Sequence, residues 1–287
     1  MPEAPLPSDW PPILLGLIGA GVQASRTPRM HEREGARHGL RTIYRLIDLT
    51  ALGLDASALP DLVTAAERMG FTGLNITHPC KQAVIPLLDE LSPEAAALGA
   101  VNTVLFREGR RIGHNTDGWG FAEGFRRELG DASREAVVQL GAGGAGAAVA
   151  HALLDLGVER LTIVDPEPAR AATLVEALER RFGRDRASIG EAAQALPGAR
   201  GIVNATPVGM ADHPGTPLPP DLLTPEQWVA DIIYLPIETA LLREARARGC
   251  RTMGGSGMAV FQAVRAFELF TGIEPDAERM RRHFESL

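Results

Sequence analysis

The sequence predicts a two-domain α/β protein in which strands alternate with helices around mostly parallel sheets. Its 287 residues exceed what a single hydrophobic core usually serves, so two domains are the first expectation. Short apolar runs of strand character alternate with stretches of helical spacing along most of the chain. In addition, a glycine-rich turn lies between one such run and a helical stretch. This alternation is typical of parallel sheets with helices on their faces.

In the first part of the chain, four apolar runs are expected to form strands. A helix is predicted over 59–69, ended by Gly70, and helical spacing also extends from Ala83 to Leu91. An amphipathic stretch over 118–130 reads as a connecting helix. The expected strands in this part are 13–18, 42–47, 73–76 and 101–106.

The second part begins with the apolar run 137–140 and continues in the same alternating manner. After the glycine-rich turn a helix runs through Leu156, and another helix is expected from Pro236 to Gly249. Two terminal helices follow over 258–271 and 275–284. The further expected strands are 161–164, 202–203 and 229–233.

Composition and charge exclude several functional classes. The net charge of -7, from 29 Lys and Arg against 36 Asp and Glu, argues against a nucleic-acid binder, which needs a basic face. Cys80 and Cys250 are too few for a disulfide framework and fit no metal motif. Segment 1–12 lacks the basic and apolar parts of a signal peptide, and no apolar run has the length of a membrane span. We therefore expect a cytoplasmic protein without membrane or nucleic-acid partners.

The histidines do not suggest a metal site. They show no grouping with metal-ligand spacing, and we expect them at the surface or at the rim of a cleft. No metal cofactor is predicted. The residues concerned are His31, His38, His78 and His114.

Segment 75–81 (Asn-Ile-Thr-His-Pro-Cys-Lys) places polar groups at the end of a predicted strand. Strand-to-helix turns are where α/β proteins hold their ligands. Pro79 suits the first position of the following helix, so Lys81 is expected in its first turn, where the helix dipole disfavours a cation by about 0.5 kcal/mol. This segment alone does not decide whether Lys81 has a functional role or is a solvated surface lysine.

The turn Gly141-x-Gly143-x-x-Gly146 has the spacing and the strand-to-helix context of a dinucleotide site. Such glycines let the backbone approach a pyrophosphate at a helix N-terminus, and we include Ala142, Gly144 and Ala145 in this contact. Asp165 lies 19 residues beyond Gly146, the offset of an acid that binds the adenosine ribose. A carboxylate there repels a 2′-phosphate, so NAD is favoured over NADP. Arg170 could still accept a phosphate.

A second polar segment follows another short strand. Asn204, Thr206, Pro207 and Val208 are expected beside the cofactor, although a loop with an Asx turn is the alternative. At the end of the strand 229–233, structural use is expected for Asp231, and Tyr234 is a candidate for the substrate cleft. Further candidates for cofactor contact are Ile233, Gly255 and Met258.

Taken together, these segments resemble the shikimate dehydrogenase family, and more closely its NAD-linked quinate/shikimate branch. The resemblance spans nearly the whole chain, and the ordered set is far more specific than any one motif. It is carried by Leu17 to Gly19 with Ser25 to Pro28 and His31, Gly73 to Lys81, Gly99 to Thr103 with Asn115 to Gly118, and Met258 to Gln262, besides Gly141 to Gly146 and Asn204 to Met210.

The resemblance implies a substrate domain over 1–118, completed by helices in 255–287, a Rossmann domain over 119–254, and a cleft at their junction. It also implies reversible oxidation of a ring hydroxyl of quinate or shikimate. Lys81 and Asp117 would form the catalytic pair, and Asp117 could in addition be a helix N-cap, a role compatible with catalysis. Ser25 and Thr27 would hold the substrate carboxylate, with an ST-turn as the alternative. Thr77, Asn102 and Gln262 would bind ring hydroxyls.

Departures from the family pattern leave alternatives open. Thr27 replaces a common Ser, Cys80 replaces a common Phe, and Asp165 stands where NADP-dependent members carry a basic segment. An NADP-dependent biosynthetic shikimate dehydrogenase, a non-catalytic quinate sensor, an amino-substituted ring substrate and a homodimeric assembly all stay open.

Overall fold

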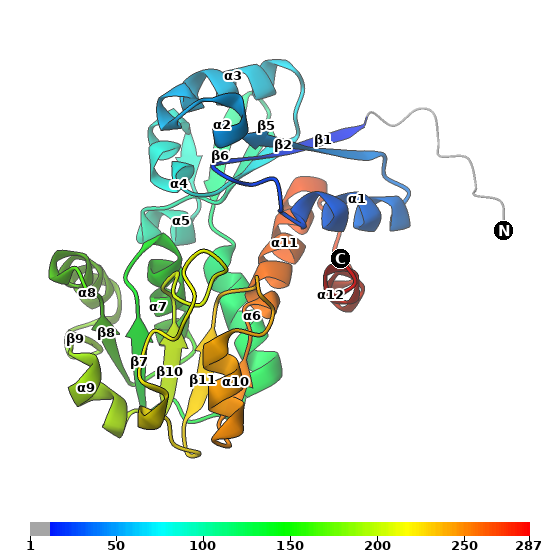
Figure 1. The fold of residues 1–287 in the computed structure, drawn as a ribbon. Coiled ribbons are helices and arrows are strands. Elements are labelled where there is room, and N and C mark those ends of the chain that lie inside the picture. Colours follow the sequence, from blue (N-terminus) through cyan, green and yellow to red (C-terminus); the bar gives the residue numbers. More distant parts are fainter. Residues whose placement is uncertain (1–11) are drawn as a thin grey trace. The chain divides into compact units, whose positions relative to one another are not determined.

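A computed structural model describes residues 12–287, which divide into two compact units. The first unit comprises the chain up to Thr116 together with Ala263–Leu287, and the second comprises Asp117–Gln262. Each contains a sheet with helices on its faces (Figure 1), so the predicted α/β class is confirmed. Segment 1–11, in which we expected no targeting signal, lies outside the described residues. No helix in the described part has both the length and the apolarity that a membrane crossing requires.

Over the described residues, the sheet of the first unit has six strands in the order β2-β1-β3-β5-β6-β4. β1 runs parallel to β2 and β3, whereas β5 runs antiparallel to both β3 and β6. The hairpin of β5 and β6 was not anticipated from the sequence. The strands are β1 (Ile13–Gly19), β2 (Thr42–Asp48), β3 (Gly73–Ile76), β4 (Glu90–Leu91), β5 (Thr103–Arg107) and β6 (Arg110–His114).

Helices cover both faces of this sheet. On one face, Val63 of α3 and Cys80 of α4 pack in a core with Ile18 and Leu74. On the other face, Phe270 of α11 packs against Leu15 and Tyr44. The helices of this unit are α1 (Thr27–Arg37), α2 (Leu49–Leu52), α3 (Leu59–Arg68), α4 (Cys80–Ala83), α5 (Pro93–Leu98), the part of α11 (Ser256–Thr271) from Ala263 on, and α12 (Ala277–Glu285), with short 3₁₀ turns at Ala56–Ala58 and Ile85–Leu87.

A buried carboxylate joins α12 to α1 within the first unit. Glu34 is 2% exposed and accepts hydrogen bonds from Asp276 N (2.9 Å) and Arg279 Nε (2.9 Å). Burial opposes the charged form of Glu34, but the hydrogen bonds from Arg279, Asp276 and His38 outweigh it and lower its pKa. Glu34 is therefore ionised at neutral pH, and removal of Arg279 would leave its charge buried without a cation.

The second unit has a wholly parallel sheet in the order β12-β11-β10-β7-β8-β9 over the described residues. Helices α6, α7 and α8 pack on one face, and α9 and α10 on the other. The chain leaves β7 first to one side and later returns to its other side, which makes the carboxyl ends of β7 and β10 a topological switch point. The elements are α6 (Asp117–Leu129), β7 (Ala136–Leu140), α7 (Gly144–Asp155), β8 (Arg160–Val164), α8 (Pro168–Phe182), β9 (Ala187–Ile189), α9 (Ala192–Ala195), β10 (Gly201–Asn204), β11 (Trp228–Asp231), α10 (Ala240–Ala247) and β12 (Arg251–Met253), with 3₁₀ turns at Leu196–Gly198 and Pro220–Leu222.

Two predicted helices are shorter in the structure. The helical spacing after Lys81 yields only α4 and a 3₁₀ turn, because Pro86 lacks an N–H and disfavours helical geometry at Ile85. Pro79 precedes α4 instead of opening it. The helix expected from Pro236 begins at Ala240, where the Thr239 side chain accepts a hydrogen bond from Leu242 N (3.2 Å). In both cases a cap or a proline decided the boundary.

His31 is fully buried, which corrects its expected place at the surface or cleft rim. Its ring lies among the aromatic rings of Tyr44, Phe267 and Phe270, with centroid distances of 5.2, 5.9 and 5.9 Å. Neither ring nitrogen has a hydrogen-bond partner among the described residues. Burial lowers its pKa to about 3, so the ring is neutral at physiological pH.

Candidate active site

The topology of the first unit brings several candidate residues to one edge of its sheet. β1 and β3 are parallel, so the segments that follow them leave from the same edge. β5 begins at that edge because it is antiparallel to β3, and β6 ends there because Thr103 pairs with His114. Thr77 follows β3, Asn102 precedes β5 and Thr116 follows β6. Hydroxyl and amide groups from three strands therefore meet at one place.

Thr77 lies at this edge in close contact with Gly19, the last residue of β1. A Cβ atom at Gly19 would come within 2.2 Å of Thr77 Cγ2, so only glycine leaves room for this threonine. Thr77 N also donates a hydrogen bond to Ile18 O (2.9 Å). The half-buried hydroxyl-bearing side chain is thus fixed by the end of the neighbouring strand.

Lys81 lies on α4, four residues beyond Thr77, and is half-buried. Its carbonyl oxygen accepts a hydrogen bond from Val101 N (2.9 Å), which ties α4 to the residue before Asn102. Cys80 beside it is fully buried, and burial raises the pKa of its thiol, so this cysteine is a packing residue and not a nucleophile. Lys81 is also the only lysine in the full sequence, because 28 of the 29 basic residues are arginine.

The polar contacts of Asn102 are extensive. Its Oδ1 accepts hydrogen bonds from Thr116 N (2.9 Å) and Thr103 Oγ1 (3.0 Å), and its Nδ2 donates to Thr116 Oγ1 (2.9 Å). Asn75 on β3 donates from Nδ2 to Thr103 Oγ1 (3.1 Å) and accepts from Tyr44 Oη at its Oδ1 (2.7 Å). The sequence did not reveal the role of Tyr44 or Thr103, although a tyrosine and a threonine within apolar strands need polar partners once buried.

The Ser25 and Thr27 segment follows β1 and leads into α1. Thr27 N donates to Ser25 Oγ (3.3 Å), which is the ST-turn named as the alternative to carboxylate binding. Asp48 at the end of β2 accepts a hydrogen bond from Gly21 N (2.9 Å) and so holds the start of this loop. Burial disfavours the charge on Asp48, but hydrogen bonds from Gly21, Gln23, Ala51 and Thr50 lower its pKa. The two hydroxyl residues are half-buried on an anchored loop.

In the second unit, the glycine turn follows β7 at the switch point. Gly141 has φ +99°, and a Cβ on Gly146 would come within 2.4 Å of Gly141 O, so both positions require glycine. A Cβ on Gly143 or Gly144 would meet no atom within 4 Å, so the turn has an open side. The N–H groups of Gly141 and Ala142 donate to Val164 O (2.8 Å) and Asp165 Oδ2 (2.7 Å). The turn and the N-terminus of α7 together fit a dinucleotide pyrophosphate, which would be held by the backbone N–H groups of Gly143, Gly144 and Ala145.

A buried glutamine supports this turn from below. Gln139 on β7 donates from Nε2 to both Gly141 O and Gly146 O (2.8 Å each). The role of Gln139 was not predicted from the sequence, although a glutamine within the apolar run 137–140 indicates a buried hydrogen-bonding role.

Asp165 follows β8 and contacts the same turn. Its Oδ2 accepts from Ala142 N (2.7 Å), and its Oδ1 accepts from Glu167 N (2.8 Å). The half-buried carboxylate thus lies beside the glycine turn, where each oxygen can still accept another hydrogen bond. Arg170 is exposed and forms an ion pair with Glu167 (2.5 Å).

The segment after β10 is ordered by its own side chains. Asn204 Oδ1 accepts from Thr206 N (3.0 Å), the Asx turn named above, and Asn204 Nδ2 donates to Val208 O (3.0 Å) and Asp231 Oδ1 (3.1 Å). Burial raises the pKa of Asp231, opposed by hydrogen bonds from Thr239, Ile233 and Asn204. Asp231 therefore has a structural role. Pro207 is exposed on this loop.

The remaining candidates of the second unit differ in burial. A Cβ at Gly255 would come within 2.2 Å of Ile232 O, and Ile233 and Met258 are buried. Tyr234 is 38% exposed, Asp117 is the first residue of α6, and Gln262 on α11 donates from Nε2 to Ala259 O (3.0 Å). Asp117 therefore lies in the first turn of its helix, where the dipole favours a carboxylate.

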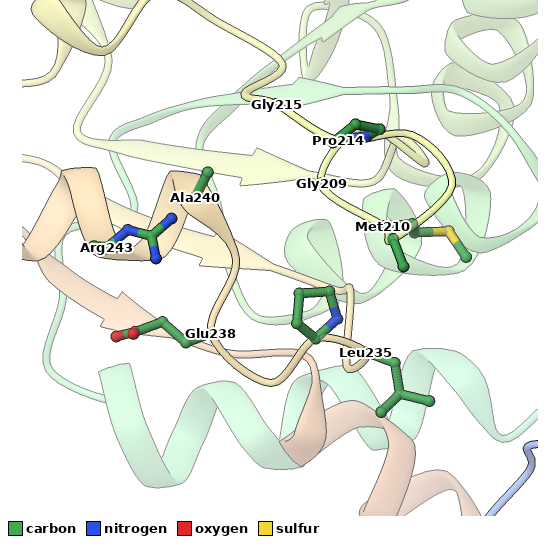
Figure 2. A pocket seen from close by; sticks show the side chains of 10 residues that line it. Gly209, Met210, Pro214, Gly215, Leu235, Glu238, Ala240 and Arg243 are labelled. Atoms are coloured by element: carbon green, nitrogen blue, oxygen red, sulfur yellow. The ribbon is translucent and has the colours of Figure 1, made fainter.

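A pocket of about 550 Å³ lies between the loop after β10 and the start of α10. Figure 2 shows Glu238 and Arg243 on one side of it, with Met210 and Leu235 on the other. Its lining begins at Gly209, the residue after Val208. In residues 12–287, no group of three or more His, Cys, Asp or Glu side chains could hold a metal ion.

The parallel sheet order and the glycine turn at its switch point define a Rossmann-type unit joined to a second α/β unit. The chain belongs to the shikimate dehydrogenase family. Two family models match it, the shikimate dehydrogenase substrate binding domain over residues 17–104 and the shikimate 5'-dehydrogenase C-terminal domain over 255–283.

Individual relatives agree with this assignment. The chain is 60% identical to the shikimate dehydrogenase (NADP(+)) of Streptomyces avermitilis, over 93% of each chain. It is 54% identical to the quinate/shikimate dehydrogenase (NAD(+)) of Corynebacterium efficiens, over 96% of this chain and 98% of the relative. Among solved structures, quinate dehydrogenase from Corynebacterium glutamicum in complex with NAD matches with a TM-score of 0.91 and 50% identity, over 96% and 99% of the two chains.

Proposed function

We propose that this protein is a dehydrogenase that reversibly oxidises a ring hydroxyl of quinate or shikimate to the 3-dehydro acid, with NAD as acceptor. The observation that carries this proposal is the place of the only lysine. At 28 positions the chain carries arginine, which keeps its proton at any physiological pH. The one lysine lies on α4, four residues after Thr77 and tied through the backbone to the Asn102 segment. The names of the relatives support the same activity.

In this mechanism Lys81 handles the hydroxyl proton. When bound, NAD supplies the carbon that accepts the hydride. As the ring carbon becomes a ketone, its hydroxyl must lose a proton, and a positioned amine that takes it contributes about 10²–10⁴ in rate. In the reverse direction the ammonium returns the proton to the ketone oxygen. Asp117 is the proposed second member of the catalytic pair.

The other candidates would hold the substrate. Thr77, Asn102 and Gln262 would contact the ring hydroxyls, Ser25 and Thr27 the carboxylate, and Tyr234 the ring. All of these side chains are neutral, so their hydroxyl and amide groups would recognise a polyol through hydrogen bonds. The carboxylate of the substrate would likewise be bound by hydroxyl groups and not by a cation.

The catalytic role of Lys81 is tested by its replacement. Lys81→Ala is expected to lower kcat with quinate and shikimate by about 100-fold or more while the variant still binds both acids. Because no other lysine is present, an amine-selective acylating reagent can modify only Lys81 and the N-terminus. Protection of Lys81 by bound substrate, read by peptide mass spectrometry, checks its position independently. Normal turnover by Lys81→Ala would refute the assignment.

A separate experiment addresses the cofactor, because the relatives include both NAD- and NADP-dependent enzymes. The Asp165 carboxylate next to the glycine turn supports NAD, since it would repel a 2′-phosphate. Asp165→Asn keeps an oxygen for Ala142 N–H but removes the charge. We expect the ratio of kcat/KM for NAD over NADP to fall by about tenfold or more. A wild-type preference for NADP would favour an NADP-dependent shikimate dehydrogenase instead.

A further inference from the structure

We propose that the pocket between the loop after β10 and the start of α10 binds an amino acid with a large apolar side chain. In this site Arg243 holds the carboxylate, Glu238 the ammonium group, and the opposite wall the side chain. The pocket lies within the second unit, and it shares no lining residue with the cofactor and substrate contacts proposed above. It is therefore a site apart from the proposed catalytic one, and its occupancy does not depend on that activity.

Arg243 on α10 supplies the positive charge. The two other arginines in the segment 240–249 have partners, because Arg246 pairs with Glu238 (2.7 Å) and Arg248 pairs with Glu244. The side chain of Arg243 is exposed at the pocket and forms no ion pair within residues 12–287. Its guanidinium is therefore able to take both oxygens of a carboxylate ligand.

The start of α10 also favours an anion on this side of the pocket. Ala240 is the first residue of α10 and lines the pocket. The first turn of a helix has N–H groups without acceptors in the helix, and its dipole attracts negative charge. Figure 2 shows Arg243 on the same side as Ala240. The carboxylate of the ligand is thus assigned to this side.

Glu238 supplies the negative charge. It lies on the same side of the pocket as Arg243 (Figure 2), but the two side chains are not paired with each other. Arg246 Nη1 donates to Glu238 Oε1 (2.7 Å), and the second oxygen, Oε2, is able to accept hydrogen bonds from a ligand. A carboxylate bound at Arg243 therefore has an acceptor for an ammonium group beside it, as the zwitterion of an amino acid requires.

The opposite wall is apolar. Met210 and Leu235 lie there, away from the two charged side chains (Figure 2), and Pro236 also lines the pocket. Met210 is 39% exposed, and Ile237, between two lining residues, is 46% exposed. Large apolar side chains that lie in water beside a pocket are stabilised by contact with an apolar ligand. This wall is the place for the side chain of the amino acid.

The pocket is preformed and of suitable size. Its volume of about 550 Å³ is within the range of about 300–1,000 Å³ for small-molecule sites. His213 O accepts from Gly209 N (2.7 Å) on one wall, and Thr239 Oγ1 donates to Asp231 Oδ2 (2.7 Å) on the other. A Cβ at Gly209 would come within 3.1 Å of Ile233 Cδ1 and 3.7 Å of Thr239 Cβ, so the two walls are in contact. Little ordering of the protein is needed when a ligand binds.

The first test compares three probes with the same apolar body by isothermal titration calorimetry on the full chain. L-Phenylalanine has both charges, hydrocinnamate has only the carboxylate, and phenethylamine has only the ammonium group. NADH and shikimate are present at saturation to occupy the proposed catalytic site, and both are reduced forms that do not react together. We expect phenylalanine to bind about tenfold or more tightly than either other probe, and alanine to bind more weakly than phenylalanine.

Two outcomes of this titration would overturn the proposal. One is the absence of binding of L-phenylalanine up to about 10 mM. The other is equal affinity for phenylalanine and hydrocinnamate, which would mean that the ammonium group has no partner. Binding that is seen only without NADH and shikimate would place the ligand in the proposed catalytic site and would overturn the proposal as well.

The second test removes each charge of the pocket in turn. Arg243→Gln should weaken the binding of phenylalanine about tenfold and leave that of phenethylamine unchanged. Glu238→Gln should weaken phenylalanine similarly but should not weaken hydrocinnamate, because that probe has no ammonium group. A general effect on folding would lower the affinity for all three probes. Loss of affinity for all three probes, or for none, would contradict the assigned roles.

The matched controls are Arg180→Gln and Glu176→Gln on α8. These two residues form an exposed ion pair (2.9 Å) in the same unit and do not line the pocket. Each control therefore changes the net charge as the corresponding pocket variant does. Both should bind phenylalanine with the affinity of the wild type, and a loss as large as in the pocket variants would mean that only net charge matters.

The position of the ligand is read by NMR of isotope-labelled methionine methyl groups. The Met210 signal, assigned with Met210→Leu, should shift when L-phenylalanine is added. Met69 in the first unit is 63% exposed and serves as the control, and its signal should not shift. A shift of the Met69 signal with an unchanged Met210 signal would place the ligand elsewhere and refute the site.

Discussion

The two units build the polar edge of their sheets from different chemical groups. In the second unit the turn from Gly141 to Gly146 offers backbone N–H groups on an open side, with Gln139 bracing it from below. In the first unit the edge consists of side-chain amides and hydroxyls, joined from Tyr44 to Asn102 across strands. The site built from backbone N–H groups tolerates few substitutions of its glycines. The site built from side chains depends on the register of several strands.

Acid should affect the two units unequally, because only the first contains a fully buried histidine whose nitrogens lack partners. The folded pKa of His31, about 3, lies below the unfolded value near 6.5, so the unfolded chain binds the extra proton. Stability from this group is complete above pH 6.5 and falls by about 1.4 kcal/mol per pH unit down to pH 3. In the second unit, His151 Nδ1 hydrogen-bonds to Ala147 O (2.9 Å), which opposes the lowering of its pKa by burial.

Denaturant unfolding from pH 7 to pH 4 measures this effect. His31→Phe keeps an aromatic ring in the cage and should flatten the pH dependence of the unfolding free energy by about 1 kcal/mol or more per pH unit. His78→Phe, at an exposed histidine, is the control for the change from histidine to phenylalanine. The same slope in His31→Phe as in the wild type would show that the acid response arises elsewhere.

A pair of glycine substitutions tests the backbone site. In Gly146→Ala the new Cβ would come within 2.4 Å of Gly141 O, so the turn must move, and we expect a loss of about 1–3 kcal/mol in stability with greatly weakened NAD binding. Gly144→Ala meets open space and should keep the stability of the wild type within about 0.5 kcal/mol. Thermal unfolding and fluorescence titration with NADH measure both. Equal stability of the two variants would contradict the tight packing described for Gly146.

The smallest effect is expected at Gln139. Gln139→Met has similar length but cannot donate to Gly141 O and Gly146 O, so the unfolding free energy should fall by about 1–2 kcal/mol. The dissociation constant of NADH should rise several-fold, while the KM for the ring acid should change less. A larger change in the KM for the ring acid than in the dissociation constant of NADH would contradict the assignment of Gln139 to the glycine turn alone.

Much of the fold follows from local pattern. The strand at 73–76 coincides with β3, and the glycine spacing located the turn after β7, because both depend on neighbouring residues only. The confirmed family assignment rests on such ordered local motifs. Helix ends were less predictable, since Pro86 and Thr239 decide them against the apolar periodicity.

Long-range pairing limited the prediction of the candidate site. Lys81 could be singled out from its segment, but the hydrogen bonds of Asn102 arise only after β5 turns back along β3. Asn102 lies directly before β5. The rule that ligand groups follow the carboxyl ends of parallel strands therefore does not identify it. The prediction that His31 lies at the surface or cleft rim was wrong. A histidine within a polar helix does not indicate that its side of the helix packs against the rings of Tyr44 and Phe270.

The divided first unit has a consequence for the order in which the chain can fold during synthesis. Asp117–Gln262 is continuous and is complete before Ala263–Leu287 has been translated. Until then, Glu34 on α1 lacks Arg279, and the face of the sheet with Leu15 and Tyr44 lacks Phe270. A nascent chain therefore carries a finished second unit while the first waits for its last helices. Ribosome-bound chains stopped before residue 263 should expose this apolar face to chaperones.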